Sequence, residues 1–172
     1  MKLFSGLRRI RNLLFGLPIR KFSAGRSLRF YRGSTINFGG WASFGDYVTI
    51  TARGGEINFG NNFKSNQNVI FNADHGGVLT FGENCLVGPM CVFRTSNHRF
   101  ESLSIPIQLQ GHVSGDICIG NDVWIGSHVV VLPGVSIGNS AVIGANSVVT
   151  KNIPDYGVAV GSPAMVIRFR NN

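Results

Sequence analysis

The stretch IGNDVWIGSHVVVLPGVSIGNSAVIGANSVVT, residues 119–150, places a large aliphatic residue at every sixth position. These residues are Ile119, Ile125, Val131, Ile137, Ile143 and Val149, and most of them are followed at once by glycine or threonine. A period of six is neither the 3.6 of a helix nor the 2 of a strand. It is typical of a chain that runs a short strand, turns and repeats, so that equivalent turns stack into a parallel β-helix.

The same spacing continues upstream. Its further members are Phe38, Phe44 and Ile50, then Phe59, Ser65 and Phe71, then Phe81, Val87 and Phe93. Three hexads make one triangular coil, so we expect an all-β domain of about five coils. Glycine occupies most of the first two corners of each coil, and Asn66 replaces it once. We therefore predict corners with a backbone conformation that glycine, or less readily asparagine, adopts at low cost.

The spacing lengthens between coils, and always at the same corner. The longest insertion separates Phe93 from Ile119, after the third coil. Loops on one face of a repeat scaffold are where function is expected. Three of the four histidines, His75, His98 and His112, fall in these insertions.

Composition is compatible with one turn-rich domain. The chain has 172 residues, of which 23 are glycine and only 14% are charged. Of the three cysteines, Cys85 and Cys91 fall on interior positions and Cys118 precedes a rung, which favours free thiols and a reducing compartment. No apolar run approaches the length of a transmembrane helix.

The first 22 residues differ from the rest, because apolar and basic residues alternate there at roughly helical spacing. Two interpretations stay open: a helix that caps the open end of the first coil, or a basic amphipathic helix on an anionic membrane surface. Much of the net charge of +8 comes from this segment and from Arg26–Arg32. Nucleic acid is not the expected partner, because basic and aromatic residues do not interleave on a binding element. We expect an N-terminal segment at 1–35, a β-helix at 36–160 with a catalytic loop at 94–116, and a C-terminal tail at 161–172.

The motifs from residue 117 onward resemble the hexapeptide-repeat acyltransferases, in their sugar O-acetyltransferase branch. The residues that carry the resemblance are Ile119-Gly-Asn-Asp-Val-Trp-Ile-Gly-Ser-His, Pro133-Gly-Val-Ser-Ile-Gly, Gly144-Ala-Asn-Ser-Val-Val-Thr-Lys-Asn-Ile-Pro and Gly161-Ser-Pro-Ala. The resemblance implies a left-handed parallel β-helix and a homotrimer with active sites between subunits. It also implies a cytoplasmic enzyme. If residues 1–22 contact the membrane, the enzyme would lie at the inner membrane face. The resemblance further implies transfer of acetyl from acetyl-CoA to a hydroxyl of a sugar, a surface polysaccharide or a lipid-linked glycan, with no metal required.

The family has its catalytic histidine at the start of the long loop, where this chain has His98. A sugar hydroxyl is a poor nucleophile at neutral pH, and an imidazole with a pKa near the operating pH can take its proton. His75 and His112 are weaker candidates that we expect to shape the acceptor pocket. The alternative is that His98 is an ordinary solvated histidine of the loop, with no catalytic role.

The resemblance also assigns binding residues. For the donor these are Ser127, Ala145, Thr150, Lys151 and Arg168, with the Ser127 amide as an oxyanion donor. For the acceptor they are Asn66, Asp74 and Trp124. Met165 departs from the pattern, because the family often has a basic residue there that contacts a coenzyme phosphate.

Three other functions are alternatives to this one. An N-acetyltransferase acting on an amino sugar or an antibiotic would need the same base and oxyanion donor, so it stays open. A non-catalytic scaffold is disfavoured by the donor motif. A zinc carbonic anhydrase is disfavoured because its metal needs histidines close together in sequence, and here all are 14 or more residues apart.

Overall fold

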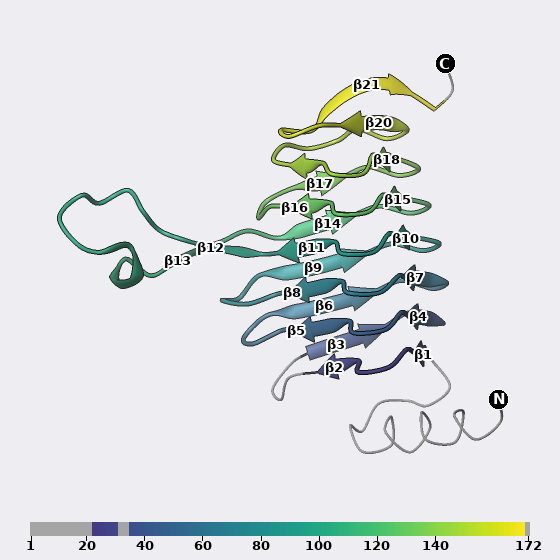
Figure 1. Ribbon diagram of the computed structural model, residues 1–172, viewed down its shortest axis with the longest axis horizontal. Coiled ribbons are helices and arrows are strands. Elements are labelled where there is room, and N and C mark those ends of the chain that lie inside the picture. The colour runs from purple at the N-terminus through teal and green to yellow at the C-terminus, as the bar shows by residue number, and fades with distance from the viewer. Residues whose placement is uncertain (1–21, 31–34, 171–172) are drawn as a thin grey trace.

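The computed structural model describes residues 22–30 and 35–170, which form a parallel β-solenoid of about six turns (Figure 1). The helix expected in residues 1–22 falls outside the described residues, except for Phe22, which is in a strand. Within the described ranges the fold is all-β, apart from one short 3-10 turn, η1 (Ile107–Leu109). The expectation of an all-β parallel solenoid is confirmed.

Three sheets form the sides of the solenoid, and each complete coil gives one strand to each sheet. The eight-stranded sheet contains β1 (Phe22–Ala24), β4 (Ala42–Phe44), β7 (Phe63–Ser65), β10 (Leu86–Val87), β15 (Trp124–Ile125), β18 (Val142–Ile143), β20 (Gly157–Val160) and β21 (Met165–Phe169). The six-stranded sheet contains β2 (Arg29–Phe30), β5 (Thr49–Thr51), β8 (Ile70–Asn72), β11 (Val92–Arg94), β16 (Val130–Val131) and β19 (Val148–Val149). The five-stranded sheet contains β3 (Thr35–Phe38), β6 (Glu56–Phe59), β9 (Val78–Phe81), β14 (Ile117–Ile119) and β17 (Ser136–Ile137).

The six-residue period places the rung residues directly above one another. Phe38 pairs in register with Phe59, and Phe59 with Phe81. Their rings stack at centroid distances of 5.6 and 5.7 Å. Every rung residue named above is buried. Apart from Ser65, the rung residues thus form an apolar column, mostly aromatic in its first half and aliphatic in its second.

The solenoid extends beyond the predicted boundaries at both ends. β1 and β2 pair with β4 and β5, so the first coil begins at Phe22 and not at residue 36. At the other end, β21 of the expected tail pairs antiparallel with β20 and covers the edge of the eight-stranded sheet. Arg170, just after β21, forms an ion pair with Asp122 at 3.0 Å. The five predicted coils become about six turns because these partial coils are added.

The corner glycines are required for a reason other than the one predicted. Gly60, for example, does not have a positive φ angle. A Cβ atom there would lie 2.4 Å from the backbone carbonyl carbon of Gly82 in the next coil. The left-handed residues come two positions later, as at Asn62 after Gly60 and Asn68 after Asn66. The expectation that Asn66 is the left-handed residue of its corner is therefore wrong.

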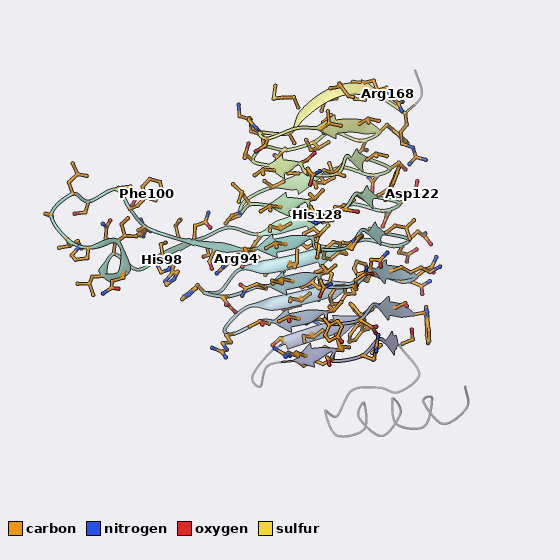
Figure 2. The ribbon with its side chains drawn as sticks, in the orientation of Figure 1. Arg94, His98, Phe100, Asp122, His128 and Arg168 are labelled. Carbon is orange, nitrogen blue, oxygen red and sulfur yellow. The ribbon has the colours of Figure 1, made fainter. Side chains whose placement is uncertain are left out.

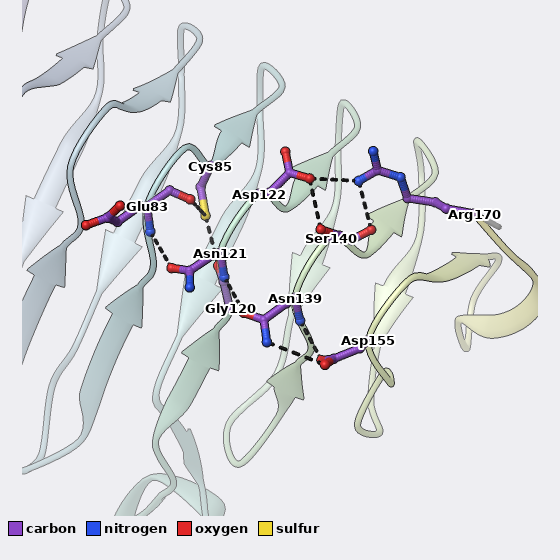
Figure 3. A network of polar contacts seen from close by, with 9 residues as sticks. All are labelled: Glu83, Cys85, Gly120, Asn121, Asp122, Asn139, Ser140, Asp155 and Arg170. Atoms are coloured by element: carbon purple, nitrogen blue, oxygen red, sulfur yellow. Dashed lines mark hydrogen bonds and ion pairs between the residues drawn. The ribbon is translucent and has the colours of Figure 1, made fainter.

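A ladder of side chains reinforces the corner that follows the five-stranded sheet (Figure 3). The side-chain oxygen of Asn121 accepts the Glu83 N–H at 2.8 Å, and that of Asn139 accepts the Asn121 N–H at 2.9 Å. Asp155 continues the ladder by accepting the Asn139 N–H at 2.7 Å. Each side chain thus caps a backbone donor that the turn leaves unpaired in the neighbouring coil.

Two buried thiols also bond to the backbone of the next coil, but as hydrogen-bond donors. Cys85 donates from Sγ to the Gly120 carbonyl at 3.1 Å, and Cys91 donates to the Gly126 carbonyl at 3.0 Å. Burial raises the pKa of the Cys85 thiol to about 11 and also raises the pKa of Cys91. Both therefore stay protonated, as donors must, and neither is in a disulfide.

The corner packing predicts unequal effects for two glycines at the same corner of adjacent coils. A Cβ at Gly60 would meet backbone at 2.4 Å, whereas at Gly39 the nearest atom is 3.5 Å away. We expect Gly60→Ala to lower the free energy of unfolding by about 1–3 kcal/mol, as overpacking does. Gly39→Ala is the matched control and should change it by much less. Denaturant melts of both variants measure this, and equal melts would contradict the steric explanation.

Candidate active site

The long insertion forms an arm that leaves the solenoid after β11 and returns to β14 (Figure 1). Its base is an antiparallel pair, β12 (Ser96–His98) and β13 (His112–Ser114). Gln110 closes the loop beyond, because its Nε2 donates to the Ser102 and Ile105 carbonyls at 2.8 and 3.0 Å. The arm is thus a hairpin with a defined root.

The hairpin brings together three histidines that are far apart in sequence. His98 and His112 face each other across the β12–β13 pair, with ring centroids 4.2 Å apart. The His75 ring stacks on the other ring, His112, at 3.9 Å and an interplanar angle of 16°. Sequence reasoning placed all three at one corner but gave no sign that their rings stack.

Asp74 holds the loop that carries His75. Its Oδ1 accepts a hydrogen bond from the Arg53 N–H at 3.0 Å, and its Oδ2 accepts one from Asn72 Nδ2 at 2.9 Å. Its main-chain carbonyl accepts a hydrogen bond from Thr95 Oγ1 at 3.2 Å. The carboxylate is half-buried beside the histidines, so it is both a positioning group and the nearest negative charge.

The surroundings lower the pKa of His112 below its ordinary value. The largest cause is removal of the imidazole from water. The neighbouring His75, His98 and Arg94 add to the effect because each disfavours another positive charge, and Asp74 opposes it. His112 therefore stays neutral to a lower pH than an isolated histidine.

The predicted donor residues lie at a different corner. Ser127 and Ala145 lie in adjacent coils just after β15 and β18, where the Asn146 N–H donates to the Ser127 carbonyl at 2.9 Å. Asn66 lies at the same corner two coils earlier, just after β7. The histidines lie beyond the far end of the six-stranded sheet. Figure 2 shows this separation: His98 is out on the arm, while His128, next to Ser127, is on the body of the solenoid.

Asn66 and Trp124 share one groove. It has a volume of about 480 Å³ and is also lined by Ser43, Lys64 and Leu86. Trp124 is 56% exposed, so its indole forms an open wall of the groove. Lys64 was missed by sequence reasoning, although its place between two buried residues of β7 marks it as outward-facing. A second groove, near Cys118 and Asn139, contains none of the predicted site residues.

The remaining predicted donor residues are exposed near the C-terminal end. Thr150 and Lys151 follow β19, and Arg168 is in β21 (Figure 2). Met165 is also exposed, at the start of β21. No described contact joins these residues to the histidine cluster within one chain.

Within residues 22–30 and 35–170, no three His, Cys, Asp or Glu side chains are arranged to hold a metal ion. No helix in these ranges is long and apolar enough to cross a membrane.

Comparison with known proteins now identifies the repeat. Residues 119–151 match the family model "Bacterial transferase hexapeptide (six repeats)". The chain is 41% identical over 124 residues to galactoside O-acetyltransferase of Escherichia coli, covering 69% of this chain and 57% of that one. It is 35% identical over 135 residues to a probable acetyltransferase of Mycobacterium tuberculosis, covering 78% and 44%.

This chain belongs to the hexapeptide-repeat family. Among solved structures it resembles galactoside acetyltransferase in complex with coenzyme A, with a TM-score of 0.59, 35% identity, and coverage of 86% and 65%. A maltose O-acetyltransferase from Clostridium difficile gives a TM-score of 0.55 at 27% identity, with coverage of 86% and 70%. The N-acyltransferase AntD of Bacillus cereus shares the fold, with a TM-score of 0.69 at 19% identity and coverage of 87% and 84%. The chain spans about half the length of the curated relatives it matches, between 44% and 60%.

The electrostatics of the cluster can be tested by titrating His112. Arg94→Gln removes a positive neighbour and should raise the pKa of His112, whereas Asp74→Asn removes the opposing carboxylate and should lower it further. Histidine-selective NMR titration measures both shifts. If the two variants moved the pKa in the same direction, the charge assignment would be wrong.

Proposed function

We propose that this chain is an acetyl-CoA-dependent O-acetyltransferase acting on a hydroxyl of a sugar or glycan. The observation that carries the proposal is the 41% identity to galactoside O-acetyltransferase over 124 residues, together with the match of residues 119–151 to the hexapeptide transferase model. The exposed position of His98 at the root of the arm supports it.

His98 is the proposed general base. A hydroxyl held at its free ring nitrogen loses its proton to the imidazole as the oxygen attacks the thioester carbonyl of acetyl-CoA. The C–S bond then breaks, and the proton passes from the imidazolium to the departing thiolate. The ring of His112, with its centroid 4.2 Å from that of His98, limits the orientations open to His98.

The corner at Ser127 is the proposed oxyanion site. The tetrahedral intermediate carries a negative charge on the former carbonyl oxygen, and the Ser127 N–H would donate to it. Such a backbone donor typically contributes about 10²–10³-fold in rate. Ala145 one coil further would contact the pantetheine arm, while Thr150, Lys151 and Arg168 would bind the phosphate and adenine end.

The acceptor would lie between the histidines and the groove of Asn66 and Trp124. Asp74 uses one lone pair of each oxygen for the loop, which leaves others for a sugar hydroxyl. Because His98 and the groove are at opposite ends of the six-stranded sheet, we propose that a homotrimer joins the corner of one subunit to the arm of its neighbour. We also propose that the coils wind left-handed, as hexapeptide repeats do.

Apolar side chains on the arm support burial against a neighbour. Phe100, Leu103 and Leu109 are 68%, 102% and 67% exposed, and no residue of η1 is buried. Exposed apolar groups concentrated on one projecting element are typical of interaction surfaces.

We place the reaction in the cytoplasm. Residues 1–22 would either contact the inner face of the membrane or cap the end of the first coil.

Removing the base should abolish turnover without abolishing donor binding. We expect His98→Ala to lower kcat by about 10²–10⁴-fold while acetyl-CoA binds nearly normally. His98→Asn should be no better, because asparagine does not accept the proton. His128→Asn is the matched control, because asparagine tolerates the positive φ of 58° at that corner. Steady-state kinetics and calorimetry measure this; a fully active His98→Ala would assign the base elsewhere.

The donor assignment predicts a different kinetic pattern. Lys151→Ala and Arg168→Ala should raise the KM for acetyl-CoA with little change in kcat, because contacts remote from the reacting carbon bind ground and transition states alike. With acetyl-dephospho-CoA as the donor, the KM of the wild type and that of at least one of these variants should differ less than they do with acetyl-CoA. If the dephospho thioester were used as well as acetyl-CoA by all three proteins, the assignment would fail.

A further inference from the structure

The root of the arm gathers basic groups that have no carboxylate partner. Arg94 ends β11, where the arm begins, and Arg99 follows β12; both are exposed. Arg99 Nε donates to the main-chain carbonyl of His112 at 3.3 Å, which ties its guanidinium to the backbone of β13 at the root of the arm. Arg94 is close enough to His112 to disfavour its protonation. Across residues 22–30 and 35–170 the ion pairs are Arg26–Asp46 and Arg170–Asp122, neither of them here.

The carboxylates of this region are already engaged by other donors. Both oxygens of Asp74 accept hydrogen bonds within its own corner, as described above. Glu101 Oε2 accepts the Phe100 N–H at 3.1 Å, further out on the arm. Asp116 Oδ1 accepts the Val78 N–H at 2.8 Å, at the start of the next coil. Among the described residues Arg94 and Arg99 therefore have no ion-pair partner, and Asp74 is the carboxylate that acts on the histidine stack.

We propose that the acceptor carries an anionic group, a phosphate or a carboxylate, and that this group binds at Arg94, Arg99 and the His75–His112 stack. This inference rests on the proposed function and narrows its acceptor class. Guanidinium groups bind such oxyanions through paired N–H donors. A stacked imidazole can add one more donor, because its ring N–H points outward in the plane of the ring. Since His98 is paired with His112, the anionic group would lie beside the hydroxyl that reacts.

The chemistry of the stack favours an anion over a neutral ligand. Two imidazoles with centroids 3.9 Å apart repel each other when both are protonated. An oxyanion between them and Arg94 offsets that repulsion, so its binding should be coupled to uptake of a proton by His112. A neutral sugar offers no such compensation and would leave the guanidinium groups unpaired.

Coenzyme A also carries phosphates, so the two sources of an anion must be separated. The test uses Arg94→Gln, which removes charge at the root of the arm. Its control is Arg29→Gln, an exposed arginine of the same sheet on β2, three strands away from β11. A coenzyme phosphate at this site would raise the KM for acetyl-CoA in Arg94→Gln, and that result would overturn the proposal.

The first measurement is histidine NMR with inorganic phosphate as the probe, and it does not depend on turnover. We expect saturable shifts of His75 and His112 and a rise in the pKa of His112 in the wild type and in Arg29→Gln. In Arg94→Gln the affinity for phosphate should fall about tenfold or more, as for loss of one charge-assisted bond. Absence of a saturable shift in the wild type, or equal affinity in the two variants, would overturn the proposal.

The second measurement compares acceptors that differ only in charge, such as methyl glucuronide and methyl glucoside, or a sugar phosphate and its parent sugar. We expect a higher kcat/KM for the anionic member, a preference that Arg94→Gln reduces and Arg29→Gln keeps. Equal use of neutral and anionic acceptors would overturn the anionic-acceptor inference but leave the acetyltransferase intact. Transfer to none of them, despite phosphate binding, would count against the proposed function instead.

Discussion

The close approach of successive coils is the constraint on which the structure depends. Strands in neighbouring coils are hydrogen-bonded, so each corner must fit within the usual strand separation of about 4.8 Å. At Gly60 and Gly126 a Cβ would lie 2.4 and 2.7 Å from backbone atoms of the next coil, which is why these corners have glycine. The insertions of this chain lie at the remaining corner, which carries the arm and the histidines.

The parts of the fold that follow the six-residue period were predictable from the sequence. Rung residues such as Phe59 and Ile125 were identified, and both are buried. The partial coil at β1 and β2 was missed because its inward residue Ala24 is too small to mark a rung, although Phe30 lies six positions later. The role of the corner glycines was misjudged because sequence alone does not distinguish a φ requirement from a steric one.

The candidate site was only partly predictable for the same reason. The insertion corner and the candidate base His98 follow from spacing and resemblance. The stack of His98, His112 and His75 does not, because it depends on a long-range hairpin whose β12 and β13 strands are separated by a loop of 13 residues. The separation of His98 from Ser127 likewise becomes visible only when the coils are folded. One chain holds the two halves of the proposed site at different corners, and the proposed trimer would bring them together.

The central claim is that His98 acts with the donor corner of another subunit, and mixed trimers test it most directly. His98→Ala lacks the base, and the double variant Lys151→Ala, Arg168→Ala lacks donor contacts and is inactive at limiting acetyl-CoA. When the two are unfolded together and refolded as a mixture, sites with an intact base from one subunit and an intact donor corner from its neighbour form by chance. We predict recovery of about a quarter of the wild-type rate, the share expected for random assembly around a closed ring. A mixture that stays as inactive as its parents, with mixed trimers verified by mass, would contradict the account.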